Sequence, residues 1–159
     1  MCLQKLNPKI DYNFDKINAL INELEAKKII TAKEAKSIDA RKVLEFTKSK
    51  IWEELKFAKE IEQEKPFYIN LPAQEFFEEQ TDENILVQGI IDLYYIDKDD
   101  KLKLVDYKTD YVKVGNENEL REKYKTQIEL YSRALEKAFG KKVDERYLYS
   151  VYLGKEIPI

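Results

Sequence analysis

The sequence contains no histidine, one cysteine and four glycines among its 159 residues. Without histidine, neither a Ser-His-Asp or Cys-His catalytic site nor a histidine-ligated zinc or haem site can form. A lone cysteine, Cys2, excludes disulfides, zinc ribbons and cysteine-ligated iron–sulfur clusters. The glycines lie far apart, which excludes both a GxGxxG motif and a phosphate-binding P-loop. Any chemistry must therefore rest on carboxylates, lysine, tyrosine or glutamine.

Long apolar runs are lacking as well, and no stretch approaches the roughly 20 residues of a membrane-spanning helix. The first residues do not show the basic and then apolar order of a secretory signal. We therefore expect a cytoplasmic protein with no membrane partner. Its length and its aromatic content of 12% are typical of one folded domain. The net charge of −3 argues against strong unaided binding to nucleic acid.

The first 65 residues have helical character, with apolar residues at helical spacing, no glycine and one proline. Thr31 followed by Glu34 predicts a helix start with a capping box. Asp11 or Asn13 is a candidate cap for an earlier helix. We expect residues 1–65 to form a helical region that packs on a core made by residues 66–159.

The remaining residues predict strands and one long helix. Runs rich in β-branched and aromatic residues indicate strands at 67–71, 85–96, 102–108 and 146–153. Gly89 inside the second run suggests a bulge or a close backbone approach, and the acidic stretch 75–83 suggests a loop or loose strand. A helix capped by Asn116 or Asn118 is expected to end near Phe139, before Gly140. This order predicts an α/β fold whose mixed sheet combines an antiparallel hairpin with a helix-linked strand that can run parallel.

Two aspartates fall opposite one another in the predicted hairpin. If the turn spans 97–101, counting back along both strands places Asp92 opposite Asp106, with Lys108 on the same face as Asp106. Opposed carboxylates repel, so protonation, the lysine or a cation must neutralise one of them. Carboxylates without histidine or thiolate favour Mg²⁺ or Mn²⁺, with the backbone carbonyl of Tyr107 as a further candidate ligand. The alternative is a solvated Asp92 that forms an ordinary ion pair with Lys108.

The predicted helix carries two further polar residues toward the sheet. Gln127 and Tyr131 are four residues apart and therefore lie on one helix face, beside the apolar stripe. A glutamine in that position needs a hydrogen-bond partner or a phosphate group. Ordinary core packing remains an alternative for Tyr131.

Together these segments resemble the motifs of a known family. Gly89-Ile90-Ile91-Asp92, Val105-Asp106-Tyr107-Lys108-Thr109-Asp110 and Gln127-Ile128-Glu129-Leu130-Tyr131 are similar, in that order, to the motifs of the PD-(D/E)xK nucleases and specifically of their RecB-like branch. Glu64-Lys65-Pro66-Phe67 and the strand from Tyr147 to Tyr152 add to the resemblance, which covers the chain from about Leu3 to its end. It implies a restriction-endonuclease-like fold.

The resemblance also implies roles for these residues. Asp92 and Asp106 correspond to metal ligands and Lys108 to the catalytic lysine, while Gln127 and Tyr131 support the site and contact DNA. The implied reaction is Mg²⁺-dependent (or Mn²⁺-dependent) hydrolysis of DNA in double-strand break repair and recombination. It is carried out by a domain of a bacterial helicase–nuclease that has a partner B subunit, and ATP would serve only helicase parts absent from this sequence. An inactive PD-(D/E)xK module and another DNA or RNA phosphoesterase of this fold remain alternatives.

One departure from the family pattern concerns the metal ligands. The family has a further ligand, a histidine, on a preceding helix, and this sequence has none. The segment from Met1 to Leu6 resembles the stretch directly after that histidine. We therefore expect a fragment with an incomplete metal site and, in isolation, weak or no nuclease activity.

Overall fold

The computed structural model describes residues 2–75 and 82–159, so most of the acidic stretch expected as a loop lies outside the described residues. The elements run in the order η1 (Cys2–Lys5), α1 (Phe14–Ala26), α2 (Ala32–Ser37), α3 (Ala40–Phe46), α4 (Lys50–Leu55), β1 (Glu60–Pro72), η2 (Ala73–Glu75), β2 (Asn84–Ile96), β3 (Leu102–Lys108), α5 (Glu117–Phe139), β4 (Glu145–Ser150) and β5 (Lys155–Pro158). None of the described helices has the length and apolar character needed to cross a membrane.

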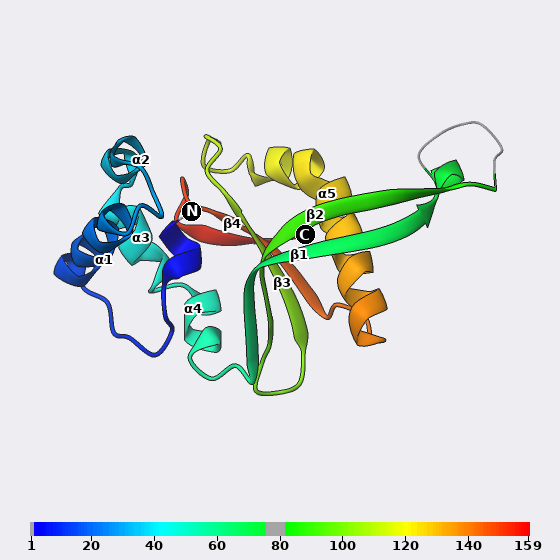
Figure 1. Ribbon diagram of the computed structural model, residues 1–159, viewed down its shortest axis with the longest axis horizontal. Coiled ribbons are helices and arrows are strands. Elements are labelled where there is room, and N and C mark those ends of the chain that lie inside the picture. Colours follow the sequence, from blue (N-terminus) through cyan, green and yellow to red (C-terminus); the bar gives the residue numbers. More distant parts are fainter. Residues whose placement is uncertain (1, 76–81) are drawn as a thin grey trace.

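The strands form one mixed sheet in the order β1-β2-β3-β4-β5. Neighbouring strands are antiparallel except β3 and β4, which run parallel and are connected through α5. Figure 1 shows the N-terminal helices gathered at one end, α5 against the sheet, and a long β1–β2 ribbon extending past the other strands. The predicted α/β fold with a mixed sheet is confirmed, while β5 was not expected.

The two largest apolar cores of the described residues lie on the two sides of the sheet. One joins the N-terminal helices to residues such as Leu93, Val105 and Tyr149, and the other joins α5 to residues such as Leu104 and Leu148. Strands β2, β3 and β4 supply both cores because successive side chains point to opposite faces. The buried Trp52 and Phe46 rings pack edge-to-face and anchor the helical side.

Local signals in the sequence produce several of the observed element ends. The capping box of Thr31 and Glu34 is present, and the Asn13 side chain accepts the Lys16 amide to begin α1. Gly140 closes α5 in the left-handed region, with φ of 66°. The helical region, however, ends at Leu55, and residues 60–65 belong to β1 rather than to a helix. That charged segment has its strand partner in β2, a pairing that helical spacing cannot reveal.

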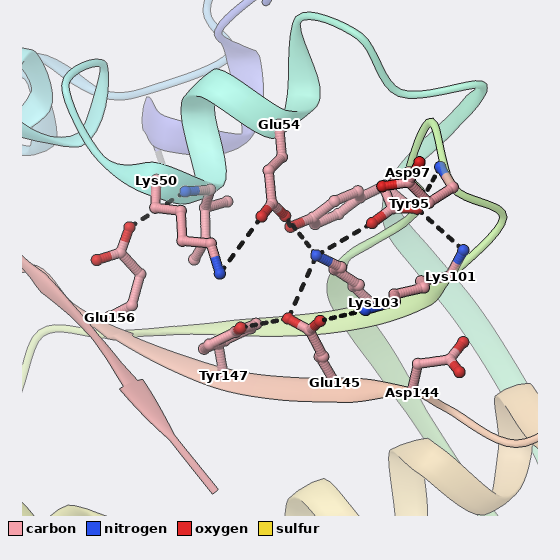
Figure 2. A network of polar contacts seen from close by, with 12 residues as sticks. Lys50, Glu54, Tyr95, Asp97, Lys101, Lys103, Asp144, Glu145, Tyr147 and Glu156 are labelled. Carbon is pink, nitrogen blue, oxygen red and sulfur yellow. Dashed lines mark hydrogen bonds and ion pairs between the residues drawn. The ribbon is translucent and has the colours of Figure 1, made fainter.

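A buried lysine at the start of β3 binds three carboxylates from separate elements. Lys103 is 3% exposed, and its Nζ lies 2.7 Å from Glu54 Oε2, 3.1 Å from Asp97 Oδ2 and 3.2 Å from Glu145 Oε2. These carboxylates come from α4, the β2–β3 turn and β4, and Figure 2 shows them converging on the ammonium group. The hydroxyl of Tyr95 donates a further hydrogen bond to Glu54 Oε2 at 2.7 Å. The network therefore joins the helical region to three parts of the sheet.

Candidate functional site

The side chains of the β1–β2 ribbon change from one face of the sheet to the other at Glu64 and Asp92. Residues two positions apart in a strand should point to the same face of the sheet. Leu93, however, packs with the N-terminal helices and Ile91 packs with α5. The paired residues of β1 and β2 skip from Gln63–Leu93 to Lys65–Ile91, and Glu64 has φ of 52°. A left-handed glutamate is strained, and such strain concentrates at functional sites. The change of face therefore falls at the aspartate that the sequence singles out.

Asp92 is held by hydrogen bonds from two separate parts of the chain. The β2–β3 pairs follow the predicted register from Ile96–Leu102 to Leu93–Val105 and stop one residue before Asp92. At that point a side chain replaces the backbone pairing of the strands: Asp92 Oδ2 accepts a hydrogen bond from the Tyr107 backbone amide at 2.9 Å. Its Oδ1 accepts the side-chain amide of Gln4 at 2.8 Å. Nothing in the sequence marks Gln4 as part of this site, because its partner lies 88 positions away.

Asp106 and Lys108 lie together near the end of β3, as the strand alternation predicts. Asp106 is 2% exposed, and its Oδ2 lies 2.5 Å from Lys108 Nζ. The same oxygen accepts no hydrogen bond of normal geometry. The alternative of a solvated Asp92 paired with Lys108 does not fit, because Lys108 pairs with Asp106. The half-buried Asp92 instead accepts hydrogen bonds from Gln4 and the Tyr107 amide.

Helix α5 presents a row of side chains to Lys108. Gln127 Oε1 accepts a hydrogen bond from Lys108 Nζ at 2.8 Å, and Gln127 Nε2 donates to the Tyr131 hydroxyl at 2.7 Å. One turn earlier, the ring of Tyr124 lies below the same ammonium group, 3.8 Å from its centroid. The sequence predicted Gln127 and Tyr131 at the site but did not point to Tyr124.

The two carboxylates resist ionisation. Burial and, to a smaller extent, the negative charge of Asp92 raise the pKa of Asp106 to about 6 against the lowering effect of Lys108. Burial also raises the pKa of Asp92, against the lowering effects of the Tyr107 amide and of Lys108. One buried and one half-buried carboxylate, both with raised pKa values, favour the binding of an additional positive charge.

The donor set fits a hard cation in part. Asp106 offers a buried oxygen without a normal hydrogen-bond donor, and its carboxylate interacts electrostatically with that of Asp92. Within residues 2–75 and 82–159, no group of three or more histidine, cysteine or acidic side chains is placed to hold a metal ion. The Tyr107 side chain is buried on the helical side of the sheet, so only its backbone carbonyl remains a candidate ligand.

Gly89 lies beside the site and is regularly paired with Phe67, so the expected bulge is not at this position. A Cβ added at Gly89 would meet Phe67 Cε1 at 2.8 Å and Tyr131 Cε1 at 3.4 Å. The close approach suggested by the sequence is therefore present, and it lets the two rings pack edge-to-face.

We expect Gly89→Ala to lower the free energy of unfolding by about 1–3 kcal/mol, because the Phe67 ring must shift to admit the methyl group. Urea denaturation measures this change. Gln88→Ala, at an exposed position of the same strand, is the matched control and should have little effect. Equal stability of the two variants would contradict this account of Gly89.

Comparison with known proteins agrees with this geometry. Residues 4–158, nearly the whole chain, match the PD-(D/E)XK nuclease superfamily. The chain belongs to this superfamily. Asp92, Asp106 and Lys108 thus lie on the expected fold, a mixed five-stranded sheet with helices on both sides.

Relatives within the PD-(D/E)XK superfamily include several proteins named as the A subunits of ATP-dependent helicase/nucleases. The chain is 40% identical to that of Clostridium novyi (strain NT) over 162 residues, 99% of this chain and 13% of the relative. It is 40% identical over 158 residues to that of Thermoanaerobacter sp. (strain X514), 97% of this chain and again 13% of the relative. The relative from Acetivibrio thermocellus is 40% identical over 151 residues, 92% of this chain and 12% of the relative. The chain thus spans about an eighth of the length of these curated relatives.

Proposed function

We propose that this PD-(D/E)XK domain hydrolyses phosphodiester bonds of linear DNA, as the nuclease part of a bacterial helicase–nuclease of the AddA type. The observation that carries the proposal is the convergence of the buried Asp106, the half-buried Asp92 and Lys108 where the pairing of β2 with β3 stops. In such a protein, helicase parts and a B subunit would deliver the strand in the cytoplasm during break repair. Weak intrinsic affinity for DNA, as the net charge of −3 suggests, is compatible with that role.

Each residue has a separate task in this proposal. Asp92 and Asp106, with the Tyr107 carbonyl, would hold Mg²⁺ or Mn²⁺, whose chemistry is to acidify a bound water and to stabilise charge on a phosphate oxygen. Lys108 points its ammonium group into the same space, where it can orient the attacking water or neutralise charge that develops on the phosphate. Gln127 fixes Lys108, and Tyr131 fixes Gln127.

Cleavage of end-labelled substrates tests this function. Linear single-stranded DNA, linear duplex DNA, RNA and a four-way junction are compared with Mg²⁺ and with EDTA, using the natural polypeptide and the 159-residue chain side by side. We expect Mg²⁺-dependent cleavage of linear DNA by the natural polypeptide, weak or no cleavage by the chain alone, and loss of cleavage in Asp92→Asn. Preference for RNA or for the junction would instead show another phosphoesterase of this fold.

The second candidate is a PD-(D/E)XK module with a structural or DNA-binding role only. It is favoured by the small ligand set, since the described residues contain no third acidic, histidine or cysteine ligand at the site. Binding of DNA without cleavage, unchanged by Asp92→Asn, would support this candidate and overturn the nuclease proposal.

A further inference from the structure

The ring of Tyr124 lies against the proposed catalytic lysine. Lys108 Nζ is 3.8 Å from the ring centroid, well inside the roughly 6 Å range of a cation–π contact. The lysine side chain is only 12% exposed, so little water competes for the ammonium group. A desolvated cation gains more from an aromatic face than a solvated one does.

The ring is itself fixed at its far end. The Tyr124 hydroxyl donates a hydrogen bond to Asp110 Oδ2 at 2.8 Å, and Asp110 also forms an ion pair with Lys123. Asp110 follows Lys108 by two residues, so the loop after β3 and the first half of α5 together form the support. Tyr124 is three residues before Gln127, which places the two side chains side by side on one helix face.

The ammonium group of Lys108 therefore meets three groups. Asp106 and Gln127 approach it through oxygen atoms at 2.5 Å and 2.8 Å, and the Tyr124 ring lies against it. If Asp106 engages a cation, its attraction for Lys108 weakens, and the amide and the ring are left to keep the ammonium group in place. An aromatic face suits this task because it attracts a cation yet has no lone pair to bind a metal.

We propose that Tyr124 is a positioning residue that holds Lys108 in its reactive orientation through its ring. This inference rests on the proposed nuclease function for its catalytic consequence. The ring, rather than the hydroxyl, is the part that acts on Lys108. Phenylalanine should therefore substitute for Tyr124, and leucine, which is apolar but has no aromatic face, should not.

Steady-state cleavage of linear DNA by the natural polypeptide measures the consequence. We expect Tyr124→Leu to lower kcat roughly tenfold with KM changed less than about twofold, and Tyr124→Phe to stay within about twofold of the parent. Tyr94→Leu is the matched control, because Tyr94 also packs on α5, against Phe139, but belongs to no contact of the site. It should leave kcat unchanged at a temperature where all variants are folded.

A second readout does not depend on activity. In the chain labelled with ¹³C at the lysine ε-carbon, the Lys108 methylene signal, assigned by its loss in Lys108→Met, should be shifted upfield by the ring. The shift should persist in Tyr124→Phe and vanish in Tyr124→Leu. An unshifted signal, an equal loss of kcat in both Tyr124 variants, or an equal loss in Tyr94→Leu would overturn the proposal. An inactive parent protein would overturn the nuclease function instead, and the NMR signal would then decide alone whether Tyr124 holds Lys108.

Discussion

Lys103→Met is expected to destabilise the fold strongly, by about 3–5 kcal/mol at pH 7. The substitution removes the positive charge that Glu54, Asp97 and Glu145 share and leaves the three carboxylates facing one another. Asp97 keeps only 8% of its side chain exposed, so water cannot replace the ammonium group there. For a chain of this length the midpoint of thermal unfolding should fall by roughly 10 °C.

The pH dependence of this effect follows from the carboxylates. Against the effect of burial, Lys103 and the Tyr95 hydroxyl hold the pKa of Glu54 below its ordinary range. The Lys101 amide together with Lys103 does the same for the pKa of Asp97. Their contribution to stability is present above the unfolded-state pKa values, 4.5 and 3.8, and is lost as the pH falls through the lower folded-state values. The cost of Lys103→Met should therefore shrink in strongly acidic solution.

Lys101→Met is the matched control for the network. Lys101 also faces Glu145, at 3.5 Å, but half of its side chain is exposed, so its loss should cost less than about 1 kcal/mol. Differential scanning calorimetry of both variants at pH 7 and pH 3 measures the difference. Equal unfolding midpoints at pH 7 would contradict the buried-network account.

Asp106→Asn is expected to stabilise the metal-free fold at pH 8. The folded-state pKa of Asp106 is about 6, raised from the ordinary 3.8 chiefly by burial and further by Asp92. Because the pKa is raised, the stability linked to this group is fully present below pH 3.8 and is lost as the pH rises through 6. Asparagine avoids that loss, worth about 3 kcal/mol, and should raise the unfolding midpoint by roughly 5–10 °C.

Asp110 provides a control of opposite sign. The hydrogen bond from Lys123 lowers the pKa of Asp110, so its ionised form stabilises the fold and Asp110→Asn should be neutral to slightly destabilising at pH 8. Thermal unfolding in EDTA at pH 8 and at pH 3.5 compares the variants, and the gain from Asp106→Asn should disappear at the lower pH. A lower midpoint for Asp106→Asn at pH 8 would show that the ionised carboxylate does not strain the site.

The sequence predicted the site residues that depend on local geometry. Strand alternation placed Asp106 beside Lys108, and helix spacing placed Gln127 beside Tyr131, because these relations need only one element each. The hairpin register also followed from its turn and held as far as Leu93 and Val105. Roles taken from the family resemblance, including metal binding and DNA contact, remain predictions.

The sequence did not predict the features that depend on distant partners. The β1–β2 ribbon changes face at position 64, which is a glutamate and not a glycine or proline, whereas Gly89 pairs regularly. Gln4 reaches Asp92 only because the first turn of the chain packs against β2. The three carboxylates around Lys103 come from separate elements, and nothing in the Leu-Lys-Leu pattern of β3 indicates that this lysine is buried.

The central claim is that Asp92 and Asp106 form a metal centre, and titration calorimetry with Mn²⁺ tests it most directly. We expect one weak binding event for the wild-type chain at pH 7.5. It should be lost in both Asp92→Asn and Asp106→Asn and retained in Glu129→Gln, which removes an exposed carboxylate of α5. Binding that survives both aspartate substitutions, or no heat from the wild-type chain, would contradict it.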